Sequence, residues 1–259
     1  MIFVLWHIQE KCGEQNNGLY AAFVDLTEAF DIVSRNGLWK ILARLGCPSV
    51  FLTILRQLHE GQQGQVKHNW PLWGSFTISN GVKQGCVLAS ILFSIFFSII
   101  PHEAKEDLLD GIYVRFRRDG SLFNLRRLFA RMKIIEELIT ELLFADDCAF
   151  FAHTEEALQH IVNRFSDAAK NFGLTISLKK TEVLYQSPPR GAYSPPNINT
   201  DGTSLNAVEH FTYLGSVISN NATASKDLDH HLSKAGSSFG RLSRKHGRVT
   251  RSASSQRSK

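Results

Sequence analysis

The chain has 259 residues, of which 43% are hydrophobic, 20% charged and 10% aromatic, and this composition excludes a disordered, collagen-like or disulfide-dense protein. The length suits one large domain, with or without an incomplete second one. The formal net charge is +5, but eight of the 29 Lys and Arg residues follow Asp229 and none of the 24 Asp and Glu residues does, so the chain up to Asp229 carries −3.

The first residues of the chain and the spacing of its cysteines bear on whether the protein is secreted or intracellular. Residues 1–6 are apolar but lack the basic start and the small-residue cleavage site of a signal peptide. The spacing of the four cysteines indicates neither a zinc site nor a disulfide framework: Cys12, Cys47, Cys86 and Cys148. We therefore expect an intracellular protein, in the cytoplasm or the nucleus, that is not secreted.

The first predicted elements are a strand and a helix. Residues 19–26 form a short apolar run that contains Asp25 near its end. Ser34 has the position of a helix N-cap, and Gly46 and Pro48 end the apolar periodicity that follows it.

A second helix and a hairpin are predicted in the middle of the chain. Residues 87–100 are apolar but fall short of the roughly 18 residues that a membrane helix needs. Serines recur there every four residues, so we expect a buried helix with one polar stripe and no membrane partner. Residues 111–123 alternate around Asp119-Gly120, which predicts a β-hairpin.

Two adjacent carboxylates divide the next apolar run, residues 142–151, so we expect two strands joined by a tight turn with Asp146 and Asp147 at its tip. Thr154 is a predicted N-cap. Strands are predicted at residues 174–178 and 183–185, and a last hairpin turns at Asp201-Gly202 and returns through residues 211–219. The order predicts an α+β fold, with helices on one face of a mostly antiparallel sheet.

Two basic segments stand out. Seven Arg and Lys residues between positions 115 and 133 are interleaved with phenylalanines, and the segment from Gly236 onward is rich in Ser, Arg and Gly. Aromatic and cationic side chains together can stack bases and follow a phosphate backbone. For the first segment, a strand pair with one core face and one solvated face fits equally well. The second segment predicts a mobile basic tail that could lie along phosphates, and a solvated or accidental terminus fits it at least as well.

Strands that bring several carboxylates to one edge need a cation there, because ionised aspartates at close range repel each other. Mg²⁺ suits hard oxygen ligands, and two such ions support phosphoryl transfer. Taken singly, an Asp-Asp pair such as Asp146-Asp147 is in most cases a solvated loop tip, and Asp25 alone is in most cases a turn residue or a helix cap.

Five short motifs occur in order: FVDLTEAFD (23–31), GVKQGCVL (81–88), FADD (144–147), GLTISLKKTE (173–182) and FTYLG (211–215). This series resembles that of reverse transcriptases. It is most similar to non-LTR (LINE-type) retrotransposon polymerases, with the RTE-like group closest. The resemblance covers most of the chain, about residues 8–245, and it implies a polymerase palm.

The resemblance implies two Mg²⁺ ions, with Mn²⁺ as an alternative. Asp25 and Asp146 would hold them, the main-chain carbonyl of Leu26 would be a further ligand, and Asp147 would support the pair. The implied reaction is attack of a primer 3′-hydroxyl on the α-phosphorus of a deoxynucleoside triphosphate. The implied partners are an RNA template, a DNA primer and dNTPs.

The resemblance also implies contacts to the incoming nucleotide. Phe30 matches the bulky residue that closes on the sugar 2′ position, although a core phenylalanine would fit the pattern too. Gln84 and Gly85 match a loop that touches nucleotide and template. Lys180 matches a lysine near the leaving pyrophosphate, with Lys179 as the competing register.

The last motif resembles a primer grip, which implies that role for Phe211, Tyr213, Leu214 and Gly215. The expected domains are a remnant of an upstream fingers connection (1–19), a palm (20–222) and the start of a thumb or a mobile basic tail (223–259). Upstream basic finger residues are not expected in so short a leading segment. We therefore weigh an active polymerase against two alternatives: a non-catalytic, nucleic-acid-binding relic, and an unrelated metal-dependent phosphotransferase or nuclease.

Overall fold

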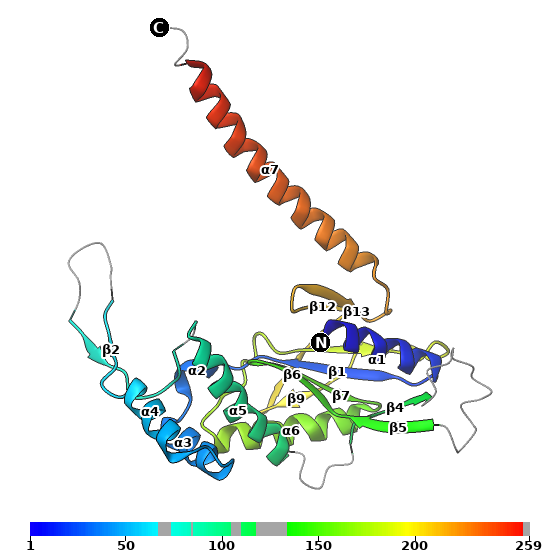
Figure 1. Cartoon of the computed structure of the whole chain (residues 1–259). Helices are drawn as coiled ribbons and strands as arrows, with labels where there is room; N and C mark the ends of the chain where they lie inside the picture. The colour runs from blue at the N-terminus through cyan, green and yellow to red at the C-terminus, as the bar shows by residue number, and fades with distance from the viewer. Residues whose placement is uncertain (67–73, 84, 105–109, 118–133, 256–259) are drawn as a thin grey trace.

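A five-stranded sheet forms the centre of the computed structural model, which describes residues 1–66, 74–83, 85–104, 110–117 and 134–255 (Figure 1). Its strand order is β11-β8-β1-β7-β6, and every neighbouring pair is antiparallel except β8 and β11. The strands are β1 (Leu19–Val24), β6 (Glu141–Phe144), β7 (Asp147–Ala152), β8 (Glu182–Gln186) and β11 (Asn206–Val208).

The central strand β1 is buried on both faces. Ala22 and Val24 belong to one hydrophobic cluster, whereas Ala21 and Phe23 belong to a second cluster on the other side. This alternation follows from the two-residue period of a strand, and two covered faces explain why the strand is apolar at almost every position. The first cluster includes α5 (Val87–Ala104) and α6 (Glu155–Asn171), and the second includes α1 (Ile2–Glu14), β12 (His210–Tyr213) and β13 (Ser216–Ser219).

Of the helices that cover the first face, α6 begins where the sequence predicts, whereas α5 continues to Ala104, four residues beyond the predicted range 87–100. Thr154 caps α6, and its hydroxyl accepts a hydrogen bond of 3.2 Å from the Ala157 amide. By length and composition α5 could cross a bilayer, but phenylalanines along it are buried in the core and its serines are exposed. This packing is that of a core helix.

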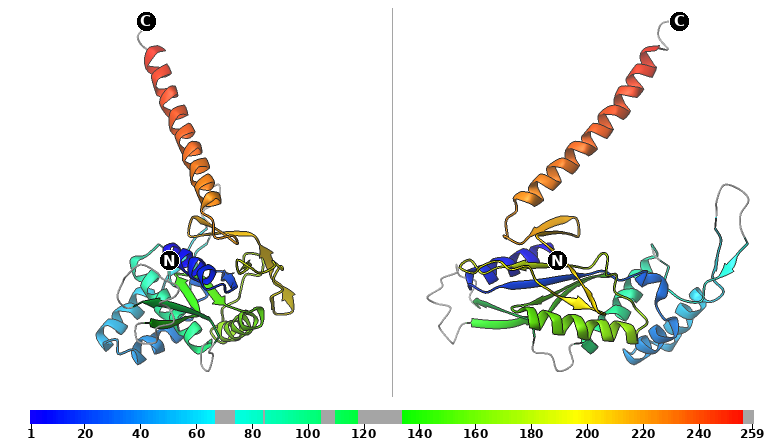
Figure 2. Two further views of the ribbon diagram at one scale, coloured as in Figure 1. Left: turned by 90° about the vertical axis from the view of Figure 1, so that its right-hand side faces the viewer. Right: turned by 180° about the vertical axis from the view of Figure 1, so that it is seen from behind.

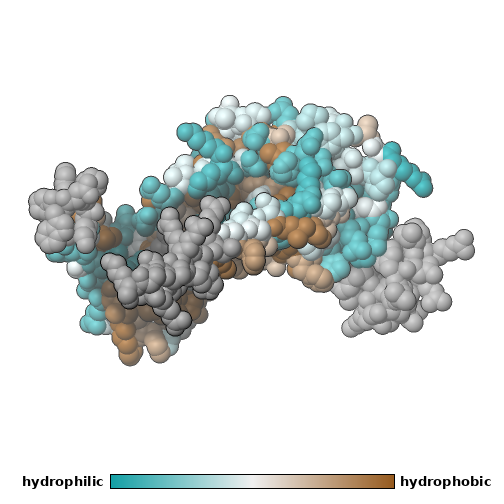
Figure 3. All heavy atoms as spheres, turned by 90° about the horizontal axis from the view of Figure 1, so that it is seen from above, coloured by the Kyte–Doolittle hydropathy of each residue, from teal (hydrophilic) through white to brown (hydrophobic). Residues whose placement is uncertain are grey.

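Helices also form one end of the molecule, beside the sheet (Figure 1). These elements are α2 (Ala29–Ile32), α3 (Arg35–Arg44), α4 (Ser49–His59) and the short ribbon β2 (Gln63–Gly64) and β3 (Phe76–Thr77). Ser34 caps α3 as predicted. Hydrophobic atoms gather at this end of the molecule (Figure 3), and α4 exposes Val50, Phe51, Ile54 and Leu58.

Three local predictions of strand pairing are wrong. Strand β4 (Ile112–Arg117) pairs with β5 (Ile134–Ile139), so Arg117 lies opposite Ile134 and not opposite a residue just beyond Asp119-Gly120. The turn itself and most of the basic cluster lie outside the described residues. Residues 174–178 form only an isolated bridge between Leu26 and Ile176. The hairpin at Asp201-Gly202 joins β9 (Asn199–Thr200) to β10 (Thr203–Ser204), while β12 and β13 form a hairpin of their own.

The C-terminal segment also differs from the expected mobile tail. It forms a long helix, α7 (Ser225–Ser255), that points away from the sheet in both views of Figure 2. Asp227 anchors its first turn, because the buried carboxylate accepts a 2.7 Å hydrogen bond from the Val217 amide in β13. Beyond that turn, Leu228, Leu232, Phe239 and Leu242 are exposed along the helix.

Gly81 supplies a testable requirement of this fold. Its φ is +79°, and a Cβ atom there would lie 2.5 Å from the Asp31 carbonyl oxygen. We expect Gly81→Ala to lower the free energy of unfolding by about 1–3 kcal/mol, as measured by urea denaturation. Gly46→Ala is the matched control, since Gly46 has a φ of +85° and open space around its Cβ position. Equal losses in the two variants would contradict the steric explanation.

Candidate active site

Three carboxylates emerge at one end of the central sheet. Asp25 follows β1 directly, and Val24, the last residue of that strand, lies opposite Cys148 in β7. Asp147 opens β7, and Asp146 lies in the two-residue turn between β6 and β7. Ala145 takes a positive φ of 53° in this turn, as the mirror-image turns of hairpins require. The predicted tight turn is therefore present, with Asp147 inside the strand rather than at the tip.

Main-chain contacts fix the segment around Asp25. Its amide donates a hydrogen bond of 3.3 Å to the hydroxyl of Thr181, which is fully buried, and its carbonyl accepts one of 2.8 Å from the Ser177 amide. Sequence reasoning missed Thr181. The local indication in the sequence is a threonine directly before the apolar strand β8. A hydroxyl that is buried there needs a hydrogen-bond partner, and the Asp25 amide is that partner.

The side chain of Lys180 reaches the same carboxylate. Its Nζ lies 3.2 Å from Asp25 Oδ1, with 68% of the lysine side chain and 28% of the aspartate side chain exposed. No such contact to Asp25 is described for Lys179. The geometry therefore brings Lys180, rather than its neighbour, to the carboxylate cluster. An ion pair this exposed contributes little to stability, so its position matters more than its strength.

The three carboxylates interact electrostatically. Burial raises the pKa of the Asp147 carboxyl, the charges of Asp146 and Asp25 raise it further, and the ammonium of Lys180 opposes them. Burial also holds the pKa of the Cys148 thiol far above its usual range, and the same three carboxylates add to that effect. The Cys148 thiol points toward the Val24 carbonyl at 3.4 Å. This edge of the sheet is therefore a concentrated negative field in which a cation is favoured.

The donor atoms at this edge suit a hard divalent ion that takes its remaining ligands from outside the chain. The Asp25 and Asp146 carboxylates and the Leu26 carbonyl all supply oxygen. Within the same part of the chain, no group of three or more His, Cys, Asp or Glu side chains is arranged to hold an ion alone. Oxygens from outside the chain, such as those of water, would have to complete the coordination.

Phe30 lies in α2, just after the carboxylate of β1. Its ring is partly buried and stacks on that of Phe93 in α5, with centroids 4.1 Å apart and planes at 19°. Phe30 can therefore pack on Phe93 in the core and still present part of its ring at the surface. Gly85 has a φ of +85°, with no neighbouring atom within 4 Å of its Cβ position, whereas Gln84 lies outside the described residues.

The β12-β13 hairpin lies against the opposite face of β1. Leu214 and Gly215 form its turn with positive φ values of 48° and 88°. Phe211 stacks on Phe23 with ring centroids 4.3 Å apart. Tyr213 is buried, its hydroxyl has no hydrogen-bond partner among the described residues, and burial together with the charge of Asp147 raises its pKa. The predicted primer-grip residues therefore contact the strand that carries Asp25.

Comparison with known proteins agrees with this geometry. A family model described as reverse transcriptase (RNA-dependent DNA polymerase) matches residues 4–218. The chain is 27% identical over 163 residues to the retrovirus-related Pol polyprotein from the type-2 retrotransposable element R2DM of Drosophila melanogaster, covering 62% of this chain and 13% of that protein. It is 24% identical over 221 residues to the RNA-directed DNA polymerase from the mobile element jockey of the same species, covering 80% of this chain and 20% of that protein.

Solved structures of similar fold include apo telomerase from Candida tropicalis truncated from its C-terminal domain, with a TM-score of 0.53 and 15% identity over 85% of this chain and 37% of that one. Telomerase from the same species with a fragment of telomeric RNA gives a TM-score of 0.51 and 14% identity over 79% of this chain and 31% of that one. These likenesses confirm the predicted α+β palm. Because the reverse transcriptase model matches most of the chain, and non-LTR retrotransposon polymerases are among its relatives, this chain belongs to the reverse transcriptase family.

Proposed function

We propose that this chain is the palm of an RNA-directed DNA polymerase that extends a DNA primer on an RNA template. The observation that carries the proposal is the meeting of Asp25, Asp146 and Asp147 at one sheet edge beside Lys180. Family membership supports the reaction class. The chain spans only 13% and 20% of the two curated relatives, so template, primer and dNTPs are proposed as the partners of the longer protein. The cytoplasm or the nucleus is the proposed location.

The proposed chemistry is two-metal nucleotidyl transfer. The Asp25 and Asp146 carboxylates and the Leu26 carbonyl would hold two Mg²⁺ ions, or Mn²⁺ in their place. When bound, the ions would activate the primer 3′-hydroxyl and stabilise the leaving oxygen. The chain's own contribution is to position these oxygens, and strand pairing on both edges of β1 does this. Lys180, which now lies beside Asp25, is proposed to move to the charge that develops on the pyrophosphate.

The nucleotide-binding and primer-binding roles are also proposed. Phe30 would contact the sugar 2′ position, since its ring lies between the core and the surface close to Asp25 in the chain. Gln84 and Gly85 would approach the nucleotide. The primer terminus would lie along the turn at Leu214-Gly215, which the Phe211 and Tyr213 contacts hold against β1.

Primer extension tests the reaction directly. We expect Asp25→Asn and Asp146→Asn to lower the rate of dNTP incorporation on an RNA template by about 10³-fold or more, because each removes a metal ligand. Asp167→Asn, on the exposed side of α6, is the matched control and should retain the wild-type rate. A folded wild-type chain that is as inactive as the Asp146→Asn variant would favour the relic hypothesis instead.

Carboxylate repulsion gives a prediction that needs no catalysis. The pKa of Asp147 is raised in the folded state, so the folded chain loses stability as pH rises and the carboxyl ionises. In the presence of a chelator, we expect Asp147→Asn to have a higher Tm than the wild type at pH 7. The gain should vanish at pH values where Asp147 is protonated in both the folded and the unfolded state. Thermal denaturation across pH measures both effects, and a lower Tm for the variant at pH 7 would contradict them.

Metal binding should raise the Tm of the wild type, because an ion that binds only the folded state stabilises it. We expect a smaller rise on addition of Mg²⁺ to Asp25→Asn than to the wild type or to Asp167→Asn.

Phe30 is tested by sugar selectivity. We expect Phe30→Val to increase the incorporation of ribonucleotides relative to deoxynucleotides by about tenfold or more, because a smaller side chain leaves room for the 2′-hydroxyl. Steady-state incorporation of dTTP and UTP measures the ratio. An unchanged ratio would reduce Phe30 to a core residue that packs on Phe93.

A further inference from the structure

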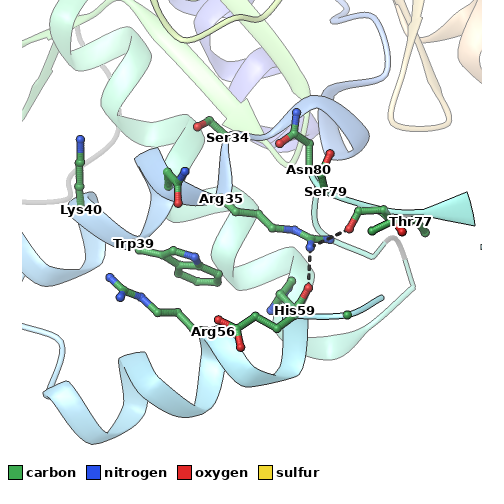
Figure 4. A pocket seen from close by; sticks show the side chains of 13 residues that line it. Ser34, Arg35, Trp39, Lys40, Arg56, His59, Thr77, Ser79 and Asn80 are labelled. Carbon is green, nitrogen blue, oxygen red and sulfur yellow. Dashed lines mark hydrogen bonds between the residues drawn. The ribbon is translucent and has the colours of Figure 1, made fainter. Parts of the chain in front are cut away.

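Arg35, the first residue of α3, joins three segments of the helical end (Figure 4). Its guanidinium donates four hydrogen bonds: from Nε to the Gly81 carbonyl at 2.9 Å, from Nη1 to the carbonyls of His59 at 2.6 Å and Ile78 at 3.2 Å, and from Nη2 to Gln62 Oε1 at 2.8 Å. The acceptors lie at the end of α4, before strand β2 and in the segment 78–81 that follows β3.

This set of contacts requires the shape of an arginine. Within the described residues no carboxylate lies at ion-pair distance from Arg35, and burial lowers its pKa. A cation at the N-terminus of a helix is also opposed by the helix dipole. Burial and the helix dipole therefore make a positive charge at this position unfavourable. What the guanidinium provides is a planar set of N–H donors that reaches all four acceptors, and the three donors of a lysine ammonium cannot reproduce that geometry.

The contacts of Arg35 continue to Phe30. The segment that Arg35 holds through Gly81 returns to α2, where the Gly81 amide donates to the Val33 carbonyl at 2.9 Å and the Val82 amide donates to the Phe30 carbonyl at 2.8 Å. The Phe30 ring stacks on Phe93. A cavity of about 600 Å³, lined by Ser79 and Asn80 among others, lies beside the arginine and leaves this segment room to move if the fork is lost.

We propose that Arg35 is a positioning residue for nucleotide selection: it fixes residues 78–82 against α2, and that segment keeps Phe30 in the place from which it contacts the sugar. The inference rests on the proposed function, because Phe30 selects nothing unless the chain binds nucleotides. Arg35 itself touches neither metal nor nucleotide.

Amide hydrogen exchange tests the structural step without any need for activity. We expect Arg35→Met to speed exchange at Gly81 and Val82 by about tenfold or more, while amides in β1 and β7 exchange as in the wild type. Arg35→Lys, which keeps the charge and is the milder change, should give a smaller increase. Arg44→Met, in the last turn of the same helix and exposed, is the matched control. Wild-type exchange at Gly81 and Val82 in both Arg35 variants would overturn the proposal.

The selectivity between deoxynucleotides and ribonucleotides tests whether Arg35 acts on nucleotide selection. We expect Arg35→Met to lower the ratio of dTTP to UTP incorporation severalfold, and to raise KM for dTTP more than it lowers kcat. If Arg35 acts through Phe30, Phe30→Val and Arg35→Met together should change the ratio no more than Phe30→Val alone. Additive effects on the ratio would overturn the proposal. A wild-type chain with no extension activity would count against the proposed polymerase, while the exchange experiment would still decide whether Arg35 holds the segment.

Discussion

Hydrogen bonding along both edges of β1 is the constraint on which the other features depend. Neighbours on both edges and hydrophobic clusters on both faces leave this strand no alternative register, since a slip of one residue would exchange the two buried faces. Asp25 therefore emerges at a fixed point beside Asp147. The two ionised groups repel each other, and the packing of residues such as Phe23 and Phe150 holds them together against that repulsion.

Local chemistry predicted a large part of this fold. Ser34 and Thr154 cap helices because a cap depends on residues within a few positions, and the turn before Asp147 follows from polar residues between two apolar runs. Residues 174–178 alternate like a strand, yet only Ile176 pairs, with Leu26. The partner of β4 was mispredicted for the same reason: strand pairing depends on residues far away in the chain, which a local pattern does not contain.

The candidate site also contains residues that the sequence motifs identify and residues that only the fold reveals. The motifs identified Asp25, Asp146 and Asp147, and the structure brings these together with Lys180. It also adds roles for Thr181 and Arg35 that the motifs did not indicate, because most of their partners are main-chain groups brought close only by the fold. An arginine at the start of an amphipathic helix reads as a solvated cation, and only the folded arrangement reveals four acceptors converging on it.

Burial of the cysteines has a practical consequence for chemical labelling. Cys12 and Cys148 are buried, and burial raises the pKa of Cys12 to about 12, so both thiols stay protonated and unreactive toward alkylating reagents. Cys86 is exposed and follows Gly85 directly. With the half-buried Cys47 replaced by serine, a fluorophore attached to Cys86 under native conditions would lie beside the proposed nucleotide-binding loop, and late modification of Cys12 and Cys148 would report how often the core opens.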